Sequence, residues 1–354
     1  MKNKLKRNYF VKIYIIVLFS LFLLACAARQ SVKETIEKSQ IKLSDQNLKE
    51  VPKPTSPHEQ KKGHHWLQLD NGNYIEYLQI GNQGEKIIFL AGILDDSIVT
   101  FSNIPELINN ANKGLCQLYF LNLPGNGYSS IPDQNIFNPI FLRLCLEQFI
   151  KKKGLKDFTL IGNSNGCLVS VLLALNENNG KDYRIKNILG FNPLLKEISF
   201  WEMDKYQILL MKTPSAMVQH LVQSPIIGYQ IARFTLGSVE NKWPWNVEKS
   251  HIDSFYNRLS ENNRCGIWSS YLKNTLKIMP ELKMICNEGY HNITQLATTV
   301  ILYSNPGDNW VPYNHVKDVA KKMNVKCKIL GNGHIPQRTD SKLVEQEILT
   351  ILKL

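Results

Sequence analysis

The stretch TLIGNSNG at residues 159–166 joins two apolar segments of different character. Residues 158–161 have the length and composition of a buried strand, whereas residues 167–175 are apolar at helical spacing. Glycines at both ends of the pattern G-x-S-x-G relieve the crowding of a tight turn between a strand and a helix. Such a turn exposes and orients a serine hydroxyl, so the sequence predicts that Ser164 is a nucleophile; a glycine-rich turn without a chemical role is the alternative.

On both sides of this turn, short apolar runs alternate with helical segments, which predicts a mainly parallel sheet covered by helices on both faces. Two strands, 66–69 and 74–80, are expected to form a hairpin around the turn DNGN. Further strands are expected at 86–90, 117–121, 158–161, 188–191, 299–303 and 325–330. Helices are expected at 136–152, 167–175, 315–323 and 341–352.

A histidine follows the last expected strand, in the stretch KILGNGH that ends at His334. A serine hydroxyl needs a neighbouring base to become a nucleophile, and we predict that His334 is that base. A lone surface histidine after a glycine turn would give the same pattern. The other histidines are poorer candidates because they precede the expected domain, lie between residues 192 and 297, or begin a helix: His58, His64, His65, His220, His251, His291 and His315.

An acid that could orient this base lies one strand and one helix earlier, in the stretch YSNPGDNWVP at residues 303–312. We predict that Asp308 has this role, although an aspartate in a loop can also serve only as a turn residue or a helix cap. The loop that follows Phe191 is the other place for such an acid. It offers Asn192 and Pro193 and no acid before Glu197.

These segments resemble the α/β-hydrolase family, in which nucleophile, acid and base follow one another in this order. The loop around Asp308 resembles the family pattern G-x-x-D-x-x-x-P, with Asn305 where the glycine is usual. The segment NLPGNGYSS resembles the family loop D-x-P-G-x-G-x-S, with Asn122 where the aspartate is usual. The resemblance covers residues 65–354 and implies a mainly parallel eight-stranded sheet with helices on both faces and an inserted helical lid.

The resemblance also implies an oxyanion hole made of backbone NH groups. One donor would be the residue after the nucleophile, Asn165, and the other Ile93 in the loop LAGILDDS at residues 90–97. The family often has His-Gly in this loop, and this chain has Ala91 and Gly92. Because the donors are backbone groups, that difference leaves the chemistry possible.

The core is therefore expected to comprise residues 65–195 and 298–354, with a helical lid at 196–297. The lid interval is rich in aromatic and apolar residues without a convincing parallel strand. These side chains could form the core of the lid itself or line an acyl pocket.

The N-terminus has the layout of a secretory signal, with basic residues up to position 12, a short apolar run and the tetrapeptide LLAC. It resembles the lipobox of bacterial lipoproteins, which implies a signal peptide at 1–25, a lipid-modified Cys26 and a polar, unpacked tether at 26–64. The protein would then be an exported, membrane-associated lipoprotein of the bacterial cell envelope. An uncleaved membrane helix and a buried Cys26 thiol are the alternatives.

The formal charge of +12 does not indicate nucleic-acid binding, since five of the basic residues precede position 26 and the rest are scattered. No cysteine or histidine spacing typical of a metal site occurs, so no metal and no cofactor are expected. Four of the cysteines lie in apolar segments as core thiols: Cys116, Cys145, Cys167 and Cys327. Cys265 and Cys286 are the one pair considered for a disulfide.

A nucleophilic serine with a base, an acid and an oxyanion hole implies acyl transfer to water through an acyl-enzyme. The expected substrate is a small ester or thioester with an apolar acyl group, as for a carboxylesterase or a lipase. Serine at position 164, rather than aspartate, argues against epoxide hydrolysis or dehalogenation. The sequence leaves open an aminopeptidase-like amide hydrolase, an acyltransferase and a non-catalytic binding protein on the same fold.

Overall fold

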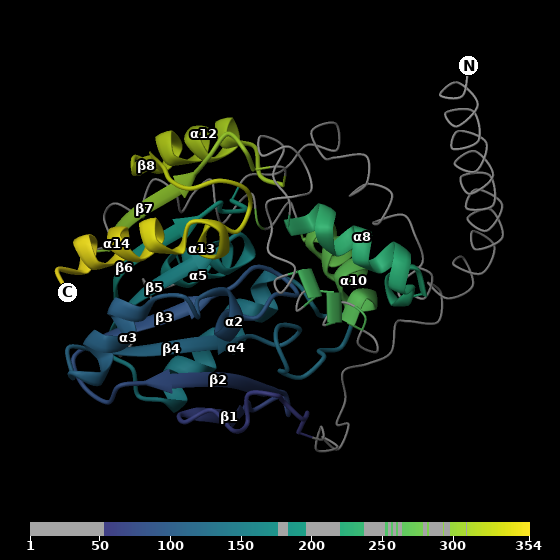
Figure 1. Cartoon of the computed structure of the whole chain (residues 1–354), viewed down its shortest axis with the longest axis horizontal. Coiled ribbons are helices and arrows are strands. Elements are labelled where there is room, and N and C mark those ends of the chain that lie inside the picture. The colour runs from purple at the N-terminus through teal and green to yellow at the C-terminus, as the bar shows by residue number, and fades with distance from the viewer. Residues whose placement is uncertain are drawn as a thin grey trace. The chain divides into compact units, whose positions relative to one another are not determined.

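The computed structural model describes residues 53–175, 183–195, 220–236, 298–308 and 310–354, with parts of 252–293 that include 264–278. Eight strands form one sheet in the order β1-β2-β4-β3-β5-β6-β7-β8 (Figure 1). Their bounds are β1 (His64–Gln68), β2 (Tyr74–Ile80), β3 (Glu85–Leu90), β4 (Cys116–Asn122), β5 (Asp157–Asn163), β6 (Arg184–Phe191), β7 (Thr299–Ser304) and β8 (Lys326–Ile329). The first hairpin is antiparallel, β2 pairs antiparallel with β4, and all other neighbours are parallel.

All eight expected strands and all four expected helices are confirmed, with shifts of a few residues at their ends. The main helices of the core are α3 (Pro105–Asn112), α4 (Pro139–Lys152), α5 (Asn165–Leu175), α12 (Tyr313–Met323) and α14 (Ser341–Leu352). The start of α4 moves from 136 to 139 because Asn138 caps it, accepting a hydrogen bond from the Phe141 backbone NH, and Pro139 follows in the first turn. The sequence did not predict helix α3. Only two of its eight residues, Leu107 and Ala111, are buried, which is too few to mark a helical face in the sequence.

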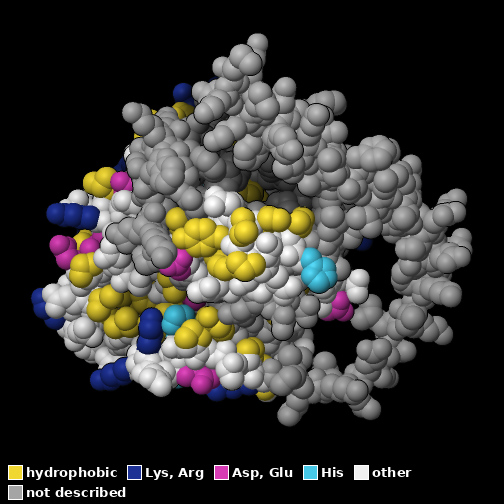
Figure 2. Space-filling view, turned by 45° about the vertical axis from the view of Figure 1, so that its right-hand side comes forward, with side chains coloured by type: hydrophobic (Ala, Val, Ile, Leu, Met, Phe, Trp, Pro, Cys, Tyr) yellow, Lys and Arg dark blue, Asp and Glu magenta, His cyan; other side chains and the backbone are white. Residues whose placement is uncertain are grey.

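Within the interval predicted as a helical lid, the structure describes helices α8 (Pro225–Leu236) and α10 (Arg264–Lys277). Most other residues of that interval, including Cys286 of the pair considered for a disulfide, lie outside the described residues, as does the whole segment 1–52 with Cys26. Figure 2 brings the side of α8 and α10 forward and shows hydrophobic side chains gathered in a band across this face. Ile226 and Ile227 of α8 are both exposed. No helix among the described residues has the length and apolar character that a membrane span requires.

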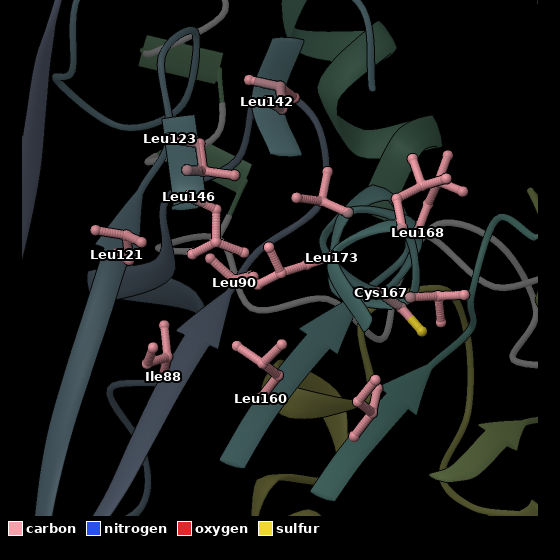
Figure 3. Packing of buried hydrophobic residues seen from close by; sticks show 14 of the residues in the cluster. Ile88, Leu90, Leu121, Leu123, Leu142, Leu146, Leu160, Cys167, Leu168 and Leu173 are labelled. Carbon is pink, nitrogen blue, oxygen red and sulfur yellow. The ribbon is translucent and has the colours of Figure 1, made fainter. Parts of the chain in front are cut away.

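The sheet is covered by apolar side chains on both faces. On one face, residues of β3 and β5 such as Ile88, Leu90 and Leu160 pack under α4 and α5 (Figure 3). In α5 every residue but the last is buried, because the helix lies between the sheet and other side chains. On the other face, α3 and α14 cover a second cluster that includes Phe89 and Phe120. This parallel, doubly covered sheet explains why its strands are apolar throughout rather than alternating.

The four cysteines expected as core thiols are free. Cys116, Cys145 and Cys167 are buried, and Cys327 is half-buried. Burial raises the pKa of the Cys116 thiol to about 11 and that of Cys145 to about 12. Both remain protonated at neutral pH and act as small apolar residues.

The end of the expected tether is packed, which corrects the prediction that the chain is unpacked up to residue 64. Ser56 and His58 are buried, and β1 begins at His64. The reason is the buried carboxylate of Glu76, which accepts a hydrogen bond from the Ser56 hydroxyl and lies 3.0 Å from His64 Nε2. The His58 ring similarly lies 3.0 Å from Asp96 Oδ2. These polar residues look like a tether in the sequence, yet they satisfy buried charges of the core.

Asn122 connects the two buried carboxylates of this network. Its amide nitrogen donates to Glu76 Oε2 at 2.8 Å and to Asp96 Oδ1 at 3.0 Å, while its amide oxygen accepts from the Ser97 backbone NH at 2.7 Å. An aspartate here, which the resembled family usually has, would place a third carboxylate against two others. The change to asparagine is therefore accounted for by the neighbouring acids of this chain.

We predict that Asn122→Asp lowers the free energy of unfolding by roughly 3 kcal/mol at neutral pH, because the new carboxyl group is buried without a cation and faces two acids. Burial and like charge raise its pKa in the folded state above the unfolded value of about 3.9. As the pH rises, the carboxyl group therefore loses its proton in the unfolded state before it does so in the folded state. The loss of stability caused by the substitution is small below pH 4 and grows as the pH rises. Thermal unfolding between pH 4 and 8 measures it.

The matched control is Asn314→Asp, the same chemical change at an exposed position of α12. It should change the unfolding temperature little. A stability of Asn122→Asp equal to that of the wild type at pH 7 would contradict this account of the network.

Candidate active site

Ser164 occupies the turn between β5 and α5, as the sequence predicts. Its φ of +50° lies in the left-handed region, which a non-glycine residue enters only when its surroundings hold it there. The Ser164 backbone NH donates to the Phe191 carbonyl at 2.8 Å, and its carbonyl accepts from the Leu194 NH at 3.3 Å. The turn is therefore fixed by the last residue of β6 and by the segment that follows this strand.

The two glycines of the motif are required by close backbone contacts. A Cβ on Gly162 would lie 2.5 Å from the Cys167 backbone nitrogen, and a Cβ on Gly166 would lie 2.3 Å from the Leu90 carbonyl oxygen. Real Cβ atoms essentially never approach backbone atoms so closely. The start of α5 is thus pressed against the end of β3, where the predicted oxyanion loop begins.

His334 and Asp308 lie together although 26 residues separate them. His334 Nδ1 is 2.9 Å from Asp308 Oδ2 and 3.0 Å from Oδ1. The Asp308 side chain is fully buried, and its Oδ1 also accepts from the backbone NH groups of Trp310 at 2.7 Å and Val311 at 3.0 Å. A carboxylate bound to Nδ1 leaves Nε2 available as the base, which is the arrangement that the sequence predicts.

The backbone at His334 also lies next to the residue that precedes Ser164. The Asn163 amide nitrogen donates to the His334 carbonyl oxygen at 3.0 Å, across the edge of the sheet. Among the hydrogen bonds of the described residues, none joins the Ser164 hydroxyl to the His334 ring. In structures without a bound substrate, a catalytic hydrogen bond of this kind is often long or poorly aligned.

The predicted oxyanion loop lies directly against Ser164. A Cβ on Gly92 would be 3.4 Å from Ser164 Cβ and 3.9 Å from its Oγ. Asn126 holds the loop with both ends of its amide, accepting from the Leu94 NH at 2.9 Å and donating to the Gly92 carbonyl at 2.8 Å. The Ile93 NH, between these two bonds, makes no hydrogen bond to another described residue. The loop thus presents an unused donor beside the serine.

The other predicted donor, the Asn165 NH, belongs to the first residue of α5 and has no partner within the helix. The side chain of Asn165 accepts a hydrogen bond from the hydroxyl of Tyr271 in α10. Tyr271 is buried, which raises the pKa of its phenol and keeps it a neutral donor, and its ring packs against Phe137 with centroids 4.9 Å apart. A helix of the predicted lid interval therefore contacts the residue after Ser164.

Sequence reasoning missed two contacts at this site. Tyr271 was one of many aromatic residues in the interval 196–297, and nothing in its spacing marked it. Arg338, four residues after His334, places Nη2 2.6 Å from Asp95 Oδ1, and both side chains are almost fully buried. This ion pair joins the segment after His334 to the oxyanion loop itself. The signal that could have suggested it is an arginine four residues after His334, together with the two acids Asp95 and Asp96.

The arrangement can activate a serine and stabilise a negative charge beside it. Among the described residues no group of histidines, cysteines and acids could hold a metal ion. The five predicted site residues lie at one end of the sheet: Ser164, Asp308, His334, Ile93 and Asn165. The strand ends of β3, β5, β7 and β8 carry them there, because parallel strands present their C-terminal ends at one edge.

The sequence matches no known protein family and no curated protein. Solved structures do match the fold. A hydrolase from Pseudomonas aeruginosa PA01 has a TM-score of 0.61 and 14% identity, covering 83% of this chain and 100% of its own. A carboxylesterase structure from the thaumarchaeon Nitrososphaera gargenis has a TM-score of 0.59 and 16% identity, covering 82% and 99%. The epoxide hydrolase CorEH has a TM-score of 0.58 and 16% identity, covering 81% and 97%.

At such low identity, these likenesses show the fold alone. Together with the strand order, they show that the chain has the α/β-hydrolase fold, an eight-stranded, mostly parallel sheet covered by helices. The fold class predicted from the sequence is thereby confirmed. The names of the similar structures include several kinds of hydrolase and a bromoperoxidase, so the chemistry has to be argued from the residues of this chain.

Proposed function

We propose that the protein is a serine hydrolase that cleaves esters or thioesters of an apolar acyl group. The observation that carries the proposal is the pairing of His334 with the buried Asp308 at the strand end where Ser164 sits on a left-handed turn. A strained serine, a histidine held by a carboxylate and an unused NH beside the serine are the parts that acyl transfer requires.

In the proposed reaction, the Ser164 hydroxyl oxygen attacks the carbonyl carbon of the substrate while His334 Nε2 takes the hydroxyl proton. The Ile93 and Asn165 NH groups stabilise the oxyanion that forms. His334 then donates the proton to the leaving alkoxide or thiolate, which departs and leaves Ser164 acylated. Water attacks the carbonyl carbon of the acyl-enzyme and loses a proton to His334. The bond from that carbon to the Ser164 oxygen then breaks as His334 returns the proton to this oxygen, which releases the acid and the free serine. The Asp308 carboxylate stabilises the imidazolium in both steps.

An apolar acyl group is favoured by the residues around the site. The Tyr271 and Phe137 rings pack together next to Asn165, and hydrophobic side chains gather on the face that carries α8 and α10 (Figure 2). Similar structures include carboxylesterases, which agrees with this choice. They also include an epoxide hydrolase; we favour ester cleavage because the nucleophile here is a serine, which forms a hydrolysable acyl ester with a carboxylic substrate.

An amide hydrolase, an acyltransferase and a binding protein without catalysis are the competing functions. Hydrolysis and acyl transfer share every step up to the acyl-enzyme and differ in whether water or an alcohol attacks it. A binding protein would have no need for the strained serine or the buried acid behind the histidine, since both are costly to hold. Because these features are costly to maintain, we favour an enzyme over a binding protein without catalysis.

We also propose that the protein is an exported lipoprotein of a bacterial cell envelope, anchored to the membrane through a lipid on Cys26. The support is the sequence alone: a basic start, a short apolar run and LLAC. The signal peptide would be residues 1–25.

Asp308→Asn should fold and should reduce kcat for p-nitrophenyl butyrate by roughly 10⁴-fold, because the amide cannot hold the imidazole in the required tautomer or stabilise its cation. Steady-state kinetics on purified protein measure the loss. The matched control is Asp157→Asn, which removes an exposed carboxylate paired with Arg184 and should leave kcat unchanged. Retention of most activity by Asp308→Asn would place the acid elsewhere, and an inactive wild type on esters of every chain length would refute ester hydrolysis.

Cys26→Ser should abolish incorporation of a tagged fatty acid and release the protein from the membrane fraction, since the thiol is the attachment point. Labelling in living cells followed by fractionation tests both. Cys327→Ser, which removes a half-buried thiol, should remain labelled. A wild type that sediments with membranes without label would point to an uncleaved helix instead.

A further inference from the structure

Three asparagines stand at the ends of three neighbouring strands next to the proposed base. Asn163 is the last residue of β5, Asn192 directly follows β6, and Asn305 directly follows β7. The strands are adjacent in the sheet and parallel, with Asn163 opposite Phe191 and Phe191 opposite Tyr303. All three side chains are therefore brought to the same edge, and all three residues are about 1% exposed.

Each of the three amide nitrogens donates to at least one of two consecutive backbone carbonyls, those of Gly333 and His334. Asn192 Nδ2 donates to the Gly333 oxygen at 2.8 Å and to the His334 oxygen at 3.0 Å. Asn305 Nδ2 donates to the Gly333 oxygen at 2.9 Å, and Asn163 Nδ2 to the His334 oxygen at 3.0 Å. The peptide units on both sides of the His334 Cα are thus held by side chains from the sheet.

The loop that carries His334 needs such contacts because its own sequence restrains it little. Gly331 and Gly333 have φ of +67° and +69°, conformations that glycine adopts without cost and leaves as readily. On its other side, the loop is held at Asn332, whose NH donates to Asp340 Oδ2 at 2.8 Å. Between these contacts, the Asp308 carboxylate fixes only the imidazole ring.

We infer that Asn163, Asn192 and Asn305, named here the asparagine clamp, are positioning residues that set the place of His334 relative to Ser164. The inference rests on the proposed function and deepens it. An imidazole bound to Asp308 can still shift as a whole if its Cα moves, and a displacement of about 1 Å is enough to cost roughly a hundredfold in rate. The clamp removes that freedom by fixing the Cα, while Asp308 fixes the ring.

The choice of asparagine also follows from the contacts. The carbonyl oxygens of Gly333 and His334 accept hydrogen bonds and need donors. An ionised aspartate in the clamp has no donor to offer, and it would also bring a charge into a buried place. Serine is too short to span from the strand end to both carbonyls as Asn192 does. Asn192 moreover has a φ of +44°, a region that asparagine tolerates better than most residues. This role accounts for Asn305 at the place where the resembled pattern has glycine.

The test uses Asn163→Ala and Asn305→Ala, because neither position has a positive φ that alanine would strain. Asn187→Ala is the matched control, since Asn187 on β6 donates its amide to the Thr159 hydroxyl at 2.9 Å, away from the histidine loop. Asn305→Gly is the second variant, the residue that the resembled pattern has at this place, should the alanine variants fail to fold. The full-length protein is used, with its unfolding temperature recorded for each variant.

Each clamp variant should lower kcat for p-nitrophenyl butyrate by about tenfold to a hundredfold while KM changes less than about twofold, because substrate binding does not use the histidine backbone. Hydrogen–deuterium exchange of the backbone amides at 331–335 should become about fivefold faster, as expected from losing one hydrogen bond. Asn187→Ala should match the wild type in both measurements.

Faster exchange with unchanged kcat would overturn the inference, since the asparagines would then hold the loop without positioning the base. Wild-type exchange at 331–335 in folded clamp variants would overturn it as well. A wild type inactive on esters would refute the proposed function, and the exchange measurement would still decide whether the clamp holds the loop. Active protein with unaffected variants would refute only the clamp.

Discussion

The close approach of α5 to the end of β3 is the constraint on which the site depends. Gly166 lies so near the Leu90 and Ala91 carbonyls that no side chain fits between them. This contact directs the turn at Ser164, with its φ of +50°, toward the loop that starts at Ala91. The serine and the unused Ile93 NH are neighbours for this reason, and the buried face of α5 supplies the apolar contact that holds the helix against the sheet (Figure 3).

Asparagine amides recur where this core has to satisfy buried oxygen atoms. Asn122 donates to two carboxylates, Asn126 holds the oxyanion loop, and the asparagine clamp binds the carbonyls around His334. Each amide supplies donors without adding charge, which matters because the surroundings already contain buried Glu76 and Asp308. A carboxylate at any of these places would need a cation, and Arg338 is already paired with Asp95.

The strands and most helices could be predicted because buried apolar runs and helical periodicity are local signals. The contact between His334 and Asp308 was predicted from their order along the chain, since the ends of parallel strands meet at one edge. The links of Tyr271 to Asn165 and of Arg338 to Asp95 depend on side chains far apart in sequence, and no periodicity marks them. His58 was wrongly assigned to the tether. In the sequence, a polar residue that pairs with a buried carboxylate cannot be distinguished from a polar residue that faces solvent.

Covalent labelling with a fluorophosphonate probe tests the central claim most directly, because phosphonylation requires both an activated serine and an oxyanion hole. The account predicts one adduct per wild-type chain, located on Ser164 by peptide mass spectrometry, strong suppression in His334→Ala and none in Ser164→Ala. Ser170→Ala should label like the wild type, since the Ser170 hydroxyl is turned to the Gly166 carbonyl within α5. Labelling that persists in Ser164→Ala, or folded wild-type protein that fails to label with even the smallest phosphonate, would contradict the account.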